Sequence, residues 1–140
     1  MAKTEITEDY VSFETAQLLK QKGFAVPVRT FYNPKYRGEK VSDGTALINY
    51  NADPEDGSVL CSAPTLQMAC KWLRNVHNII ITIDFDIYET CDDDTEVGFS
   101  FTLQKKKTPD VYDYIHYEEF DTHEEATEAA IKYCLTELIK

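Results

Sequence analysis

Apolar residues recur at helical spacing near the start of the chain. Ser12 can cap a helix whose apolar positions Phe13, Ala16 and Leu19 lie on one side. Gly23 can take the left-handed conformation that ends a helix, and Phe24 would then contact Leu19. The pattern predicts a helix over residues 12–22.

Two further helices are predicted from their start signals and apolar stripes. Pro64 and Thr65 provide the chemistry of a helix start. The stripe that follows, flanked by Cys70 and Trp72, consists of Leu66, Ala69, Leu73 and Val76. A helix over about 65–77 would bury the Trp72 ring against a sheet.

A last helix is predicted near the end of the sequence. Thr122 and Glu125 form a capping box at its start. The residues on its apolar side are Ala126, Ala130, Ile131, Cys134, Leu135 and Leu138.

Between the last two helices the period changes from helical to alternating. Ile79, Ile81, Ile83, Phe85 and Ile87 alternate with more polar residues, which predicts a strand with these five on one buried face. Asp84 and Asp86 would lie on the other face, near the strand end. Residues 97–104 alternate in the same way, and the acidic stretch 89–96 would join the two strands as a hairpin.

Shorter extended segments complete the predicted sheet. Residues 26–32 are β-branched and aromatic but contain Pro27, which favours a short edge strand or the segment that leads into one. Residues 46–50 and 59–61 flank the turn-forming stretch 53–57, which favours a second hairpin. Residues 112–120 are aromatic and extended. The order predicts an α+β fold with a mainly antiparallel sheet of about four to six strands and three helices packed on it.

Length and composition favour one packed domain over residues 1–140, with 43% hydrophobic residues. The N-terminus has no apolar signal region, and no stretch approaches the roughly 20 apolar residues of a membrane helix. The four cysteines form no CxxC motif. We therefore expect a cytoplasmic protein with reduced thiols.

The net charge of −11 is unevenly distributed. Residues 84–128 contain three Lys against fifteen Asp and Glu, whereas residues 1–40 contain seven Lys and Arg against five acidic residues. Nucleic acids and anionic lipids are usually bound by basic surfaces. Direct nucleic-acid binding and membrane association are therefore not expected.

The acidic region offers one candidate metal site. Asp84 and Asp86 share a strand face and adjoin Asp92, Asp93 and Asp94, and carboxylate oxygens are ligands for hard divalent cations. The twelve-residue calcium loop is not in register here. A solvated strand end with an acidic turn is the alternative, and we favour it.

Other candidate chemistry is scattered. Cys70 and His77 lie seven residues apart on the second helix, and Cys134, Asp121 and His123 could be assembled by folding. A core role for the cysteines is the alternative. GxGxxG, GxxxxGK[ST], GxSxG and HExxH are all absent from the sequence, so no catalytic residue and no cofactor is assigned.

One stretch is both basic and aromatic. Arg29, Tyr32, Tyr36 and Arg37 interleave over nine residues, and such a stretch can stack bases or bind phosphate. A strand followed by a solvated loop is the alternative.

Several stretches together carry a resemblance. They are residues 13–16 with 22–24, residues 63–67 with 72–74 and 77–79, and residues 124–126 with the closing apolar helix. In these the chain resembles a group of short proteins from Bacteroides-type gut bacteria and their phages and prophages. The resemblance implies a phage or mobile-element origin. That group has no assigned activity, so no catalytic residue is carried across.

Together these observations favour a small accessory protein of a phage or prophage, not an enzyme, that acts through contacts with a protein partner or with a second copy of itself. Two alternatives stay open. One is a hydrolase or nuclease that uses Asp84, Asp86 and the adjoining acids with a divalent metal. The other is an acidic decoy that occupies a host DNA-binding enzyme.

Overall fold

The computed structural model describes residues 6–33, 41–51, 60–105, 113–115 and 119–139. Within these residues the helices are α1 (Phe13–Gln21), α2 (Leu66–Val76) and α3 (His123–Tyr133), and α3 continues into a π-helical turn (Cys134–Leu138). The strands are β1 (Val28–Tyr32), β2 (Val41–Ile48), β3 (Cys61–Ser62), β4 (Ile79–Glu89), β5 (Thr95–Lys105) and β6 (Asp113–Ile115). The α+β class and the three predicted helices are confirmed.

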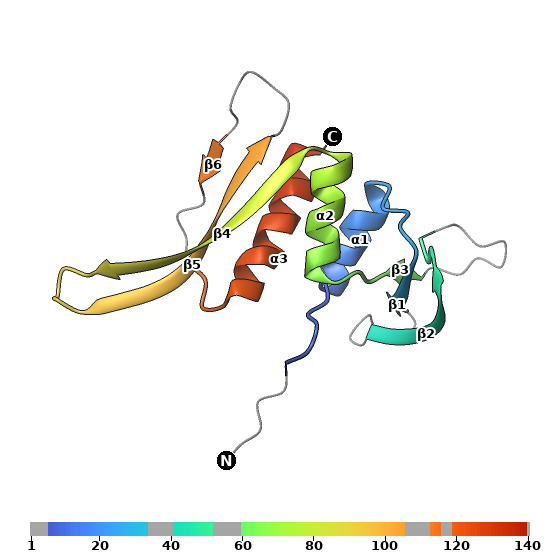
Figure 1. The fold of residues 1–140 in the computed structure, drawn as a ribbon, viewed down its shortest axis with the longest axis horizontal. Helices are drawn as coiled ribbons and strands as arrows, with labels where there is room; N and C mark the ends of the chain where they lie inside the picture. The colour runs from blue at the N-terminus through green and yellow to red at the C-terminus, as the bar shows by residue number, and fades with distance from the viewer. Residues whose placement is uncertain (1–5, 34–40, 52–59, 106–112, 116–118, 140) are drawn as a thin grey trace, which may run out of the picture.

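The described strands are divided between two antiparallel sheets, where the sequence favoured one. The first has the order β2-β1-β3 and the second the order β4-β5-β6 (Figure 1). Residues 26–32 were expected to form an edge strand, but the strand found there, β1, covers residues 28–32 and lies in the centre of its sheet. Pro27 precedes the strand and so leaves its backbone donors free to pair on both sides. The expected hairpin between 46–50 and 59–61 is wrong in its pairing, since β2 and β3 each pair with β1.

Local signals set the helix ends as expected. The Ser12 hydroxyl accepts a hydrogen bond from the Thr15 N–H at 3.2 Å. At the other end Gly23 has φ of +90°, and the Phe24 N–H donates to the Leu19 carbonyl at 3.0 Å, which is the ending predicted for α1. Thr65 and Thr122 cap α2 and α3 in the same way as Ser12 caps α1.

The core lies where the three helices meet the two sheets. Trp72 on α2 is 7% exposed and makes edge-to-face contacts with Phe24 and His77, which confirms its predicted burial. Leu66, Ala69 and Leu73 of the predicted stripe are also buried, whereas Val76 at the helix end is exposed. None of the described helices has both the length and the apolar character needed to cross a lipid bilayer.

The hairpin of β4 and β5 is the longest feature of the fold. All eleven residues of β4 pair with all eleven of β5 in one unbroken register, from Ile79 with Lys105 to Glu89 with Thr95. Asp93, with φ of +62°, lies in the tight turn that closes the hairpin, and its N–H donates to the Thr90 carbonyl at 3.1 Å. The predicted strands and acidic turn are therefore confirmed.

Candidate functional site

The distal half of the β4–β5 hairpin, from Asp84 to Gly98, extends beyond the helices, and we call it the arm (Figure 1). An eleven-residue strand is about 36 Å long, whereas an eleven-residue helix such as α3 is about 16 Å long. α2 and α3 pack on the hairpin near its root, where Ile79, Phe101 and Leu103 are buried. The helices are thus too short to cover the whole apolar face of the hairpin, which is the face that carries Ile79, Ile81, Ile83, Phe85 and Ile87.

The apolar face of the arm is open to solvent. Phe85 is 55% exposed, Ile87 is 67% exposed and Val97 is 58% exposed. Ile87 and Val97 are direct cross-strand partners, and Phe85 faces Phe99 with ring centroids 5.2 Å apart. The expectation of one buried row from Ile79 to Ile87 is therefore wrong for its distal half. Three large apolar side chains are left together on one surface, which we call the apolar row.

The outer edge of β4 carries unpaired backbone groups. Phe99 on β5 exchanges both of its backbone hydrogen bonds with Phe120, at 2.8 and 2.7 Å, on the side away from β4. In an antiparallel ladder the residue opposite Phe99, which is Phe85, must then direct its own N–H and C=O away from β5. By alternation Ile83 and Ile87 do the same. No described strand pairs with β4 on that side.

The opposite face of the arm is acidic. Asp84 accepts a hydrogen bond from the Thr102 hydroxyl at 3.1 Å, and Asp86 accepts one from the Ser100 hydroxyl at 2.7 Å. Further out, the Tyr88 hydroxyl donates to Glu96 at 2.8 Å, and this bond raises the pKa of Tyr88 above its usual range. Between residues 84 and 97 the sequence has seven acidic residues and no Lys, Arg or His. Asp84, Asp86 and Glu96 lie on this face, Glu89 lies on the apolar side at the far end of β4, and the other three are in the turn. The arm thus combines an apolar face with a strongly negative one.

Glu119 lies against this acidic face. A Cβ atom on Gly98, the cross-strand partner of Asp86, would come within 2.8 Å of the Glu119 Cβ atom. Desolvation in this position, the charge of Asp86 and a hydrogen bond to Asp86 together raise the pKa of Glu119. Gly98 therefore makes room for a second carboxyl group beside Asp86.

The candidate metal ligands are not gathered into one site. Asp84 and Asp86 lie on the strand and accept hydrogen bonds from β5, whereas Asp92, Asp93 and Asp94 lie in the turn at the tip. Across the described part of the chain, no three His, Cys, Asp or Glu side chains come together in a way that would hold a metal ion.

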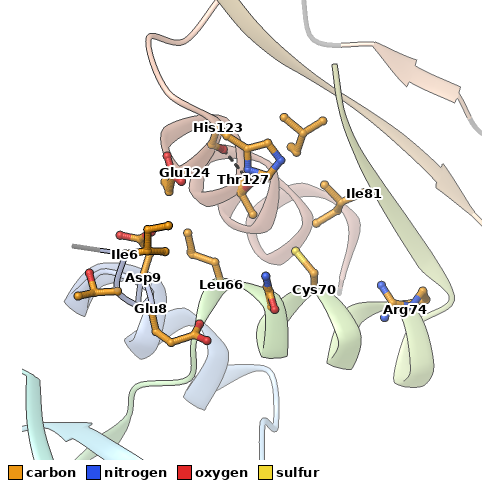
Figure 2. Close-up of a pocket in the computed structure, with 13 residues that line it drawn as sticks. Ile6, Glu8, Asp9, Leu66, Cys70, Arg74, Ile81, His123, Glu124 and Thr127 are labelled. Carbon is orange, nitrogen blue, oxygen red and sulfur yellow. Dashed lines mark hydrogen bonds between the residues drawn. The ribbon is translucent and has the colours of Figure 1, made fainter. Parts of the chain in front are cut away.

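A pocket of about 680 Å³ lies at the root of the hairpin (Figure 2). Its lining includes Ile81 and Ile83 of β4, Cys70 and Arg74 of α2, and His123 of α3. The N-terminal segment closes one side with Glu8 and Asp9, and Glu124 lies near them at the start of α3. Because Ile81 and Ile83 precede Phe85 on the same strand face, the pocket floor continues directly into the apolar row.

The cysteine and histidine candidates are separated by the fold. Burial raises the pKa of Cys70 to about 11, against a lowering by Arg74, and burial followed by the neighbouring Cys70 raises the pKa of Cys134 to about 12. Both are therefore protonated thiols at neutral pH.

The histidine candidates lie far from the cysteines with which they were grouped. His77 packs on Trp72 at the end of α2, seven residues or about 10 Å along from Cys70. His123 begins α3, and Cys134 follows its far end, which puts them about 16 Å apart along the axis. Asp121 lies just before α3, at the same end as His123.

The basic and aromatic stretch is also divided. Tyr32 is 7% exposed, and its hydroxyl donates to the Val11 carbonyl at 2.6 Å. Burial, followed by the charge of Glu128, raises the pKa of Tyr32. Arg29 is exposed on the other face of β1, and Tyr36 and Arg37 lie outside the described residues. Tyr32 therefore belongs to the core and cannot stack on a base.

Sequence reasoning missed Glu128 on α3. Its Oε1 atom accepts a 2.6 Å hydrogen bond from the Thr15 hydroxyl and a 3.0 Å hydrogen bond from the Ser12 N–H, which places a carboxylate at the N-terminus of α1. The partners are more than 110 residues apart in the chain. No local spacing signals such a contact.

We compared the chain with family models, curated proteins and solved structures, and none of the three comparisons gave a match.

Proposed function

We propose that this chain is a small protein-binding accessory protein and that the arm carries its contact with the partner. A phage or prophage origin is part of this proposal and is based on the resemblance described above. The supporting observation is the exposure of Phe85, Ile87 and Val97 together on one face. Contiguous apolar side chains at a surface are a common mark of protein interaction sites.

Two further features support the arm over other surfaces. Outside the arm, the strongly exposed large apolar residues of the described chain are spread over the N-terminal segment (Ile6), β2 (Leu47 and Ile48) and α2 (Val76). Leu47 and Ile48 are consecutive strand residues and therefore point to opposite faces. The arm also extends beyond the helices, which leave its apolar face uncovered (Figure 1).

Site-specific cross-linking tests the proposal. A photoreactive phenylalanine analogue at position 85 should cross-link to a discrete protein in lysate of Bacteroides-type bacteria, the hosts that the resemblance implies. The same analogue at position 76, which is 57% exposed and lies outside the arm, is the matched control. A product that forms from both positions, or from neither, would count against the arm as the contact surface.

A substitution test complements the cross-link. Phe85→Ser with Ile87→Ser should abolish capture of the protein that cross-links at position 85, while Leu47→Ser with Val76→Ser should retain it. Circular dichroism should show that both variants remain folded, because all four side chains are exposed.

A further inference from the structure

The outer edge of β4 is a long strand edge with little protection against pairing. Natural proteins usually block such edges with Pro, charged side chains (Lys above all), a bulge or a covering element. The charged residues of β4, which are Asp84, Asp86 and Glu89, are all acidic, so they oppose an acidic strand but not a basic one. β4 contains neither Pro nor Lys, and its register with β5 shows no bulge. Ile83, Phe85 and Ile87 direct their N–H and C=O groups outward, and no described strand takes them up. The edge is therefore a template for one more strand.

The charges on β4 disfavour a second copy of the chain in the register that pairs Ile83, Phe85 and Ile87 with one another. A two-fold pairing centred on Phe85 would place Asp84 of each copy directly opposite Asp86 of the other. Like charges at directly opposed positions destabilise a strand pair. Glu119 beside Asp86 adds to the negative charge of this face.

We propose that the β4 edge binds an extended segment of the partner in which apolar and cationic side chains alternate. This inference rests on the proposed function of the arm and specifies the chemistry of the partner. The segment would add to the sheet as a strand beside β4, with main-chain hydrogen bonds to Ile83, Phe85 and Ile87. Its Lys or Arg side chains would lie opposite Asp84 and Asp86.

The alternation follows from the geometry of β4. Neighbouring strands have their side chains in register, so residues opposite Phe85 and Ile87 point to the apolar face, and residues opposite Asp84 and Asp86 point to the acidic face. On the apolar side the added strand would cover part of the apolar row. At the root, the pocket beside Ile81 and Ile83 has room for one further apolar side chain from the segment.

A capped seven-residue peptide with Lys at odd and Val at even positions is the probe. Amide hydrogen exchange followed by NMR is the measurement, because it resolves single residues. At a free peptide concentration ten times its Kd, exchange at Ile83, Phe85 and Ile87 should slow by about tenfold, since only the free form exposes these amides. Asp84 and Asp86, whose amides face β5, should change little.

Two peptides control for charge and for alternation. One replaces every Lys with Glu, and the other keeps the composition but places all Lys before all Val. Both should bind at least about tenfold more weakly, because one opposes Asp84 and Asp86 with like charge and the other cannot match both faces at once. Equal binding of the block peptide would mean general attraction between opposite charges and would overturn the proposal.

Two proline variants test the edge itself. Ile87→Pro removes an outward N–H from β4 and leaves the ladder with β5 intact, so peptide binding should be lost. Thr95→Pro makes the same change on the opposite edge of the hairpin and should leave binding unchanged. Asp84→Asn with Asp86→Asn should weaken binding by about two- to thirtyfold. Binding that survives Ile87→Pro, or dimerisation of the free chain through β4, would overturn the proposal.

The outcomes separate this inference from the proposed function. If position 85 cross-links to a partner but no peptide slows exchange at the outward amides of β4, the arm binds a protein by another geometry, and only the inference fails. If position 85 gives no cross-link and no peptide binds, both fail.

Discussion

The root and the arm of the β4–β5 hairpin share one alternating pattern but have different surroundings. At the root Ile79 is 4% exposed, and in the arm Ile87, eight residues along the same strand face, is 67% exposed. Both residues pair with β5 in the same unbroken register. The difference comes from the helices, which reach only part of the hairpin. The same side chain therefore stabilises the fold at one end of the strand and remains available to a partner at the other.

Substitution of the same residue type at the two ends should give the largest contrast. Ile79→Ala should cost about 2–5 kcal/mol of unfolding free energy, because it removes a buried side chain and leaves a cavity. Ile87→Ala should change the unfolding free energy by less than about 0.5 kcal/mol. Urea unfolding followed by circular dichroism measures both. Similar losses of unfolding free energy at the two positions would show that the apolar face of the arm is covered in solution, and would contradict the difference between the root and the arm.

The acidic face of the arm should be sensitive to added volume even though the apolar face is open. Gly98→Ala should cost about 1–3 kcal/mol, because its Cβ would come within 2.8 Å of Glu119. Glu119→Gly in the same chain should recover part of that loss. A double-mutant cycle in thermal or urea unfolding measures the coupling. Additive costs would mean that Glu119 does not lie over Gly98.

The smallest expected effect is a pH dependence located at the root. Burial lowers the pKa of His77 below its ordinary value of 6.5. The unfolded chain therefore binds a proton at a higher pH than the folded chain does, so stability is full above about pH 6.5 and falls as the pH decreases below it. His77→Gln should reduce this loss between pH 7 and 5.5, as thermal melts can show. His123→Gln, at an exposed position, is the control, and an equal reduction there would contradict the assignment.

Local chemistry explains how much of this fold can be predicted from the sequence. Ser12, Thr65 and Thr122 cap their helices through atoms three residues away, and the alternation from Ile79 to Ile87 specifies a strand by itself. Each of these features needs only neighbouring residues. They could therefore be predicted without knowledge of the tertiary structure.

The coverage of a strand face by helices and the pairing of strands both depend on elements far away in the sequence, and these features were predicted less well. Alternation shows which side chains share a face of β4 but not whether a helix covers that face. A comparison of strand and helix lengths would have pointed to an uncovered arm, since eleven residues extend more than twice as far in a strand as in a helix. The central place of β1 between β2 and β3 has no comparable signal, because it depends on partners up to about 30 residues away.

The contact between Glu128 and the start of α1 has a consequence for the order in which the chain folds. Ser12 and Thr15 are synthesised early, but their hydrogen-bond acceptor on α3 is translated more than 110 residues later. Closing so long a loop costs chain entropy before any contact is gained. We therefore expect α1 to remain only loosely anchored on the ribosome, and to complete its N-terminal contacts only after α3 has left the ribosome.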